Sequence, residues 1–194
     1  ALNPEHISAY SLIIEEGTPF SKLYGEGTEG EKELPSEEEE REIYKRTEEL
    51  LKASGYRRYE ISNYAKDGKE CKHNLGYWER KDYLGLGLGA SSLVDNVRFH
   101  NTEDLQMYLV KSAALEEIRE DKDILDTVAQ MEEYVFLGMR KMEGILLNKE
   151  LLEHYNDNIK RMEKQGLVEI QNGYMKLTKE GIDVSNYIFA EILF

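Results

Sequence analysis

The sequence has little cysteine, little tryptophan and no long apolar run. Its 194 residues include one cysteine, one tryptophan and three prolines. A single cysteine excludes a disulfide within the chain, and also a metal site that this chain would build from cysteines alone. No apolar stretch approaches the roughly 20 residues that a membrane-spanning helix needs, and no signal peptide is recognisable. These features predict a soluble protein of the reducing cytoplasm.

Basic residues are also scarce. The chain has 25 Lys and Arg against 39 Asp and Glu, which gives a formal net charge of -14. Binding to nucleic acid requires clustered positive charge that neutralises phosphates, so we expect no nucleic-acid partner. Hydrophobic residues make up 40% of the chain and charged residues 33%, which is typical of a globular protein with one domain or two small ones.

The most informative stretch runs from residue 59 to residue 92. It holds the sole tryptophan, the sole cysteine and a run in which leucines alternate with glycines. In an extended strand the glycines would share one face with Ser91, and the leucines would pack against a covering layer. Glycines on one strand face indicate that a ligand or another backbone approaches closely. The alternating run consists of Leu84, Gly85, Leu86, Gly87, Leu88 and Gly89.

A second pattern, H-N-x-x-Y-W, lies before this run and contains His73, Asn74, Tyr77 and Trp78. Imidazole is a metal ligand, the Asn amide donates and accepts hydrogen bonds, and Tyr and Trp offer flat apolar faces with a polar edge. This set suits a flat, partly polar ligand such as a porphyrin. A loop whose aromatic side chains only close the end of a core explains the same residues, and residue types alone leave both interpretations open.

Three strings together carry a family resemblance: Y-E-I-S-N-Y-A at 59–65, H-N-x-x-Y-W at 73–78 and G-L-G-L-G at 85–89. They resemble the oxygen-independent coproporphyrinogen III oxidase-like radical SAM family, and the string at 73–78 resembles its haem chaperone branch more than its decarboxylase branch. The resemblance implies haem binding by His73, Asn74, Tyr77 and Trp78. His73 would be the iron ligand or the propionate partner, and the cargo would pass to a haem-acceptor protein.

The resemblance also implies cofactors in a longer parent protein. Family members carry an N-terminal C-x-x-x-C-x-x-C loop for a [4Fe-4S] cluster, which the sequence above does not contain. We therefore expect a fragment that holds no catalytic residue and no metal of its own and performs no radical SAM chemistry alone. Its predicted contacts to S-adenosylmethionine are Ile13, Gly85, Gly87, Gly89 and Ser91.

Two alternative functions remain open at this point. One is an enzyme, the oxygen-independent coproporphyrinogen III oxidase itself, which oxidatively decarboxylates propionate side chains. The other is a winged-helix regulator that binds DNA; it is disfavoured because residues 148–181 hold six basic and six acidic side chains and thus no basic surplus. The oligomeric state is also open, a dimer included.

The residue pattern in the first part of the chain predicts strand–helix–strand units. Alternating residues at 6–15 favour a strand, Ser36 with Glu39 forms a capping box, and a helix with one apolar stripe then runs to Gly55. A second strand follows at 56–63. This order is typical of a β/α repeat, and the family resemblance implies that residues 1–115 are the C-terminal part of a radical SAM (β/α) barrel.

The second part predicts a different architecture. A short hairpin at 94–100 precedes a helix capped by Thr102, whose buried stripe would include Leu105 and Leu109. Helices are then predicted at 124–142, from 147 and at 159–164, followed by a hairpin around Asn172-Gly173 and a helix from 178 to 194. The predicted fold class is therefore α/β: the last elements of a partial (β/α) barrel, followed by a small α+β winged-helix-like domain at 116–194.

Overall fold

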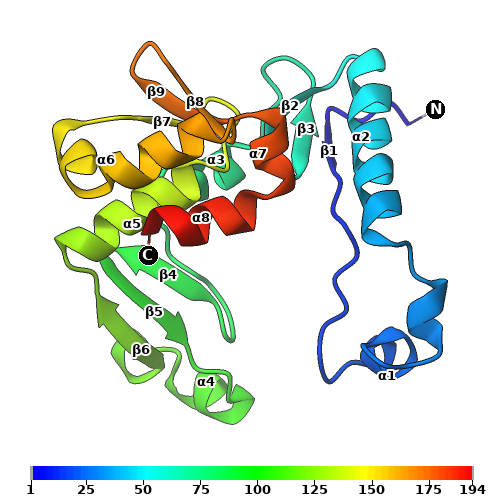
Figure 1. Cartoon of the computed structure of the whole chain (residues 1–194). Helices are drawn as coiled ribbons and strands as arrows, with labels where there is room; N and C mark the ends of the chain where they lie inside the picture. Colours follow the sequence, from blue (N-terminus) through cyan, green and yellow to red (C-terminus); the bar gives the residue numbers. More distant parts are fainter. Residues whose placement is uncertain (1, 194) are drawn as a thin grey trace. The chain divides into compact units, whose positions relative to one another are not determined.

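The computed structural model describes residues 2–193 and divides the chain into two compact units, Ala1–Cys71 and Lys72–Phe194 (Figure 1). Each unit has its own sheets and its own buried residues. The domain boundary predicted after residue 115 rests on the family resemblance and stays a prediction.

The first unit contains one sheet and three helical segments. Both outer strands run antiparallel to the central strand β3, in the order β1-β3-β2, so β1 and β2 run in the same direction. The predicted strand at 6–15 is too long, because pairing to β3 ends at Ser8 and one further bond joins Ala9 N to Ser62 O at 2.9 Å. The elements are β1 His6–Ser8, α1 Pro19–Tyr24, the 3-10 helix η1 Gly30–Glu33, α2 Glu37–Ala53, β2 Arg57–Glu60 and β3 Asn63–Ala65.

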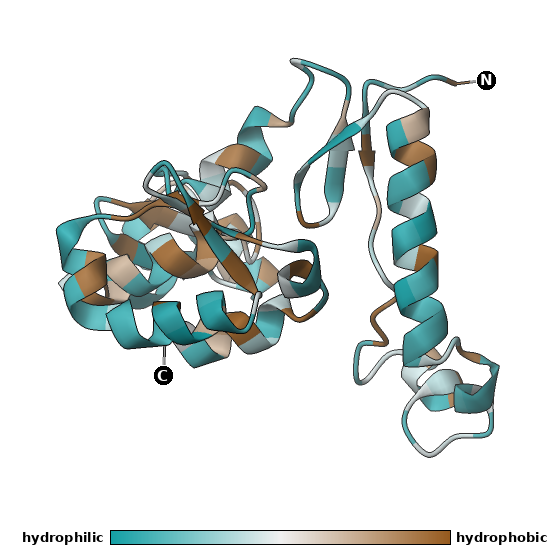
Figure 2. Cartoon of the chain, turned by 45° about the horizontal axis from the view of Figure 1, so that its top comes forward, coloured by the Kyte–Doolittle hydropathy of each residue, from teal (hydrophilic) through white to brown (hydrophobic). Residues whose placement is uncertain are grey.

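Helix α2 begins at the predicted capping box. The Ser36 hydroxyl accepts from Glu39 N, while the Glu39 carboxylate accepts from Ser36 N at 2.8 Å. The helix meets the sheet through Tyr44, whose hydroxyl donates to the carbonyl of Ile61 at 2.5 Å. Its predicted role of covering the sheet with an apolar stripe is wrong, because no residue of α2 is buried. In Figure 2 the helix is mostly hydrophilic, with separated hydrophobic positions.

The second unit begins with a short helix and a three-stranded antiparallel sheet of order β4-β5-β6. The predicted hairpin is confirmed: Asp95 and Asn96 both have positive φ, 50° and 63°, as a two-residue type I′ turn requires. The elements are α3 Lys72–Trp78, β4 Ser91–Val94, β5 Val97–Asn101, α4 Leu105–Lys111, the 3-10 helix η2 Leu115–Glu117 and β6 Arg119–Ile124.

Three predictions for this region are wrong. The cap of α4 is Asp104 rather than Thr102, because the Asp104 carboxylate accepts from Met107 N at 2.9 Å. The predicted stripe of α4 is exposed rather than buried, with Leu105 and Leu109 both more than half accessible. Residue 124 was predicted to begin a helix but ends strand β6, because this segment pairs with β5 and the next helix starts three residues later.

The C-terminal part of the second unit alternates helices with a second antiparallel sheet of order β7-β9-β8. The predicted hairpin is confirmed, with Asn172 and Gly173 at φ 54° and 81°. So is the Thr178 cap, which accepts from Gly181 N at 3.0 Å. The elements are α5 Thr127–Gly138, β7 Ile145–Leu146, α6 Lys149–Lys164, β8 Val168–Gln171, β9 Tyr174–Leu177, α7 Lys179–Asp183 and α8 Ser185–Leu193.

The helices predicted from 147 and at 159–164 form one continuous helix, α6. The buried residues on either side of the polar run at 156–158 keep helical spacing, and their burial outweighs the weak helix propensity of Asn and Asp. The last predicted helix is instead divided at Val184, and its predicted end at Phe194 lies outside the described residues. The buried residues of α6 are Leu151, Tyr155, Ile159 and Met162.

Candidate functional site

Helix α3 carries all four residues of the H-N-x-x-Y-W string. His73 and Tyr77 are four positions apart and therefore share one face of the helix. Their rings meet edge to face, with centroids 4.7 Å apart and an interplanar angle of 76°. Tyr77 in turn meets Tyr83 edge to face at 4.6 Å and 80°. The helix thus presents a ladder of three rings that begins at an exposed imidazole.

The neighbouring face of α3 carries Asn74 and Trp78. The Trp78 ring packs under a guanidinium, with the Arg140 carbon 4.7 Å from the ring centroid, which is cation–π geometry. The Trp78 indole nitrogen is buried and has no hydrogen-bond partner among the described residues. A buried, unpaired indole N–H costs free energy.

The C-terminal end of α3 has a specific backbone geometry. Lys81 N donates to Gly76 O at 2.9 Å and Arg80 N donates to Tyr77 O at 3.0 Å. These two bonds define a Schellman motif, in which the residue after the cap adopts a left-handed conformation. Here that residue is Arg80, with φ 54°. Glycine is usual at this position because a Cβ strains the left-handed backbone by about 1 kcal/mol.

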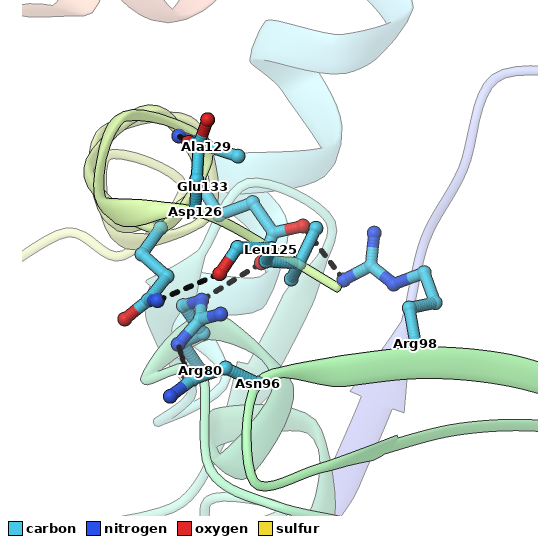
Figure 3. A network of polar contacts seen from close by, with 8 residues as sticks. Arg80, Asn96, Arg98, Leu125, Asp126, Ala129 and Glu133 are labelled. Carbon is cyan, nitrogen blue, oxygen red and sulfur yellow. Dashed lines mark hydrogen bonds and ion pairs between the residues drawn. The ribbon is translucent and has the colours of Figure 1, made fainter. Parts of the chain in front are cut away.

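The Arg80 side chain lies in a network between α5 and the β4–β5 turn (Figure 3). Arg80 Nε donates to Glu133 Oε2 at 2.7 Å, and Arg80 Nη1 donates to Asn96 Oδ1 at 2.8 Å. The other carboxylate oxygen of Glu133 lies 2.9 Å from Arg98 Nη2. The start of α5 is fixed nearby, since Leu125 N donates to the carbonyl of Asn96 at 2.9 Å.

The glycine–leucine run does not form the predicted strand. Only Tyr83 pairs with β4, through two hydrogen bonds to Leu93, and strand β4 begins at Ser91. The leucines are not covered; the side chain of Leu86 is 86% exposed. The run is a loop fixed by β5, because the Asn101 amide donates to Gly87 O at 2.8 Å and Gly89 N donates to Thr102 O at 3.0 Å.

The glycines in this loop have backbone reasons of their own. A Cβ on Gly85 would lie 2.3 Å from the carbonyl oxygen of Ser91, which is a clash with backbone. Gly87 and Gly89 have φ of 113° and 65°, conformations that side chains with a Cβ rarely adopt. Close approach of another backbone, one of the two predicted causes, is thus observed at Gly85. Ser91 is exposed at the start of β4, and Ile13 is exposed in the first unit.

The described residues contain neither a metal cluster nor a membrane span. Within residues 2–193, no three His, Cys, Asp or Glu side chains gather in a way that could hold a metal ion. No helix in this part of the chain is long and apolar enough to cross a membrane. Cys71 is a free thiol directly before α3.

Sequence reasoning missed three residues around α3: Arg80, Tyr83 and Arg140. Tyr83 follows Tyr77 closely and is itself aromatic, so a search for aromatic residues downstream of the string would have found it. The partner of Arg80 lies 53 positions away in sequence, and nothing local indicates the pairing. Arg140 ends the string E-E-Y-V-F-L-G-M-R, and nothing in that string indicates that its guanidinium contacts Trp78.

Comparison with known proteins identifies relatives. Residues 125–184 match the family model described as the HemN C-terminal domain. The chain is 32% identical to the heme chaperone HemW of Lactococcus lactis over 97% of this chain and 50% of that protein. It is 34% identical to the heme chaperone HemW of Bacillus subtilis, over all of this chain and 52% of the relative. The chain thus spans about half the length of these curated relatives.

A solved structure has the same fold. Coproporphyrinogen III oxidase (HemN) from Escherichia coli, described as a radical SAM enzyme, superposes with a TM-score of 0.71. The match covers 98% of this chain and 48% of that chain, at 16% identity. The predicted α/β fold class and the predicted resemblance to the C-terminal portion of a HemN-type protein are confirmed. Both curated relatives described above carry the name heme chaperone HemW.

Proposed function

We propose that this chain is the haem-binding part of a haem chaperone and that helix α3 holds the haem. The observation that carries the proposal is the concentration of His73, Asn74, Tyr77 and Trp78 on one short helix whose aromatic rings are already ordered. Curated relatives named heme chaperone support it. Haem is the cargo in this proposal, so the chain needs no bond-making chemistry of its own.

Each side chain has a distinct proposed role. The exposed imidazole of His73 ligates the haem iron or pairs with a propionate, and the adjacent Asn74 amide donates a hydrogen bond. Tyr77 and Trp78 form the flat walls on which the macrocycle packs. Tyr83 extends this wall, because its ring already contacts Tyr77 edge to face.

The longer protein of this family would add a [4Fe-4S] cluster and S-adenosylmethionine. The described residues offer no set of ligands for a cluster, so no step of the proposal depends on it. Contacts from Ile13, Gly85, Gly87, Gly89 and Ser91 to S-adenosylmethionine stay a prediction, as do a haem-acceptor partner and a cytoplasmic location. Backbone geometry already explains the three glycines, so they add no independent support for that cofactor.

A titration of the chain with haem, followed by the Soret absorbance, tests the proposal. We expect saturation near about one haem per chain and at least about tenfold weaker binding for His73→Ala, because loss of an iron ligand or charged partner removes a dominant contact. His154→Ala is the matched control: this imidazole is exposed on α6 and bonds only its own helix, through Glu150 O at 3.0 Å.

The titration also has a result that contradicts the proposal. Absence of a saturable Soret change, or equal affinities for wild type and His73→Ala, removes α3 as the haem site. The alternative enzyme activity is tested separately, by offering coproporphyrinogen III to a protein with a rebuilt cluster. Turnover of that substrate, with no retention of haem, favours the decarboxylase.

A further inference from the structure

We propose that Arg80 is a positioning residue that locks helix α3 against helix α5 and thereby sets the orientation of Tyr77 and Trp78 toward their ligand. This inference rests on the proposed haem function of α3. The lock consists of Arg80 and its two acceptors, Glu133 and Asn96. We call these three residues the Arg80 latch.

The first argument is the residue type at the end of the helix. The Schellman motif places Arg80 in the left-handed region, where glycine carries no strain. Backbone geometry alone would therefore favour glycine at this position. Strain of this kind persists where the surrounding structure holds it, and such residues gather at ligand clamps. The presence of arginine indicates that its side chain is required.

The second argument is the burial of the ion pair. The side chains of Arg80 and Glu133 are only 14% and 15% exposed. Arg80 approaches through Nε at 2.7 Å, so the bond fixes the direction of the guanidinium as well as its position. A partly buried carboxylate that loses such a partner keeps its desolvation cost without compensation. The pair is thus sensitive to removal of either member.

The third argument is that α5 and the turn after it contact the end of α3 at two places. Glu133 on α5 pairs with Arg80, which lies two residues after the helix that carries Trp78. Arg140, in the turn that follows the end of α5 at Gly138, places its guanidinium over the Trp78 ring. The two contacts therefore define both the end of α3 and the plane of its last aromatic ring.

Asn96 gives the latch its third support. Its side-chain oxygen accepts from Arg80, and its backbone carbonyl accepts from Leu125 N at 2.9 Å, immediately before the Asp126 cap of α5. Arg80 thus contacts both α5 and the β4–β5 turn, as Figure 3 shows. A rotation of α3 about its own axis would break these bonds together.

The test compares Arg80→Gly and Glu133→Gln with wild type. Arg80→Gly removes the side chain but relieves the left-handed strain, so the fold is retained while the latch is lost. Glu133→Gln keeps the shape and removes the charge. Arg98→Gln is the matched control, because Arg98 contacts the other oxygen of Glu133 and its side chain is 42% exposed.

Two measurements follow the latch. Trp78 is the sole tryptophan, so its fluorescence and its quenching by acrylamide report the orientation of α3 without any haem. We expect acrylamide quenching of Trp78 to rise about twofold in both latch variants. Haem affinity should fall about tenfold, because imprecisely positioned binding groups bind a ligand less tightly. Arg98→Gln should change both values by less than about a factor of two, as expected for an exposed pair.

The outcomes separate this inference from the proposed function. Unchanged Trp78 quenching in both Arg80→Gly and Glu133→Gln overturns the latch, whatever happens with haem. If quenching rises in the latch variants but the wild-type chain binds no haem, the haem proposal is contradicted and the latch is retained as a structural lock. Increased quenching with unchanged haem affinity overturns the positioning role. If Arg80→Gly fails to fold, Glu133→Gln and Arg98→Gln still decide between these results.

Discussion

Helices α2 and α6 are similar in sequence design and different in outcome. They are 17 and 16 residues long, both carry one apolar stripe, and both have a polar N-cap, Ser36 and Asn148. Helix α6 buries four of its side chains, whereas α2 buries none. On α2, Ile43 and Leu50 are 55% and 68% exposed.

The comparison teaches that periodicity predicts a helix and its apolar side, but not whether that side is covered. The apolar side of α2 lines a groove of about 270 Å³ together with the segment at residues 9–14. Burial of apolar surface supplies most of the stability of a protein helix, while capping supplies a smaller, local share. The two helices should therefore respond differently to the same kind of mutation.

The largest expected effect is loss of a buried side chain on α6. Leu151→Ala should lower the free energy of unfolding of the second unit by about 3 kcal/mol, because it removes a fully buried leucine and leaves a cavity. Leu50→Ala on α2 is the matched control and should cost under about 0.5 kcal/mol. Urea unfolding followed by Trp78 fluorescence measures the first, and far-ultraviolet circular dichroism the second. Equal losses would mean that α2 is as well packed as α6.

A smaller effect is expected at the helix caps. Ser36→Ala and Asn148→Ala each remove about 1 kcal/mol of capping. In α2 the loss should accelerate amide hydrogen exchange along several turns, because no buried contact holds the helix. In α6 it should accelerate exchange only in the first turn, because Leu151 and Tyr155 remain packed. If exchange accelerates over the same number of turns in both helices, buried contacts do not distinguish α6 from α2.

The smallest expected effect concerns an exposed contact within the well-packed unit. The Asp121 carboxylate and then the Asn101 carbonyl raise the pKa of His100 above its ordinary value, since both accept from the imidazole ring. A raised pKa in the folded state stabilises the fold below the unfolded pKa of about 6.5, and this contribution is lost as the pH rises through the folded value. Asp121→Asn should lower the His100 pKa, measured by an NMR titration of its ring protons.

If Asp121→Asn leaves the His100 midpoint unchanged, the contact is absent in solution.

Two local signals were read correctly from the sequence, although the cap predicted at Thr102 was not. The capping box at Ser36 and the turn at Asn172-Gly173 depend on residues within three positions of each other, and both are confirmed. The segment at 119–124 gave no such signal: its letters R-E-D-K-D-I show neither apolar alternation nor turn residues, and it becomes strand β6 only because β5 offers a free edge.

The candidate site likewise combines residues that are contiguous in sequence with contacts between distant positions. The residues of α3 were visible as a string because they are contiguous. The contacts that hold them, Arg80 to Glu133 and Arg140 to Trp78, join positions more than 50 apart and exist only in the folded chain. The alternating glycines predicted a strand because they fit its two-residue period. The structure instead has positive φ at Gly87 and Gly89, and the sequence pattern does not distinguish these two cases.

The order β1-β3-β2 in the first sheet has a consequence for synthesis. Strand β1 pairs with β3, and the bonded side chains of Ser8 and Asn63 lie 55 residues apart. Closing a long loop costs more entropy than closing a short one, and distant pairings form slowly. The ribosome makes β1 before β3, so the edge of β1 that pairs with β3 stays unpaired until the later segment has been synthesised.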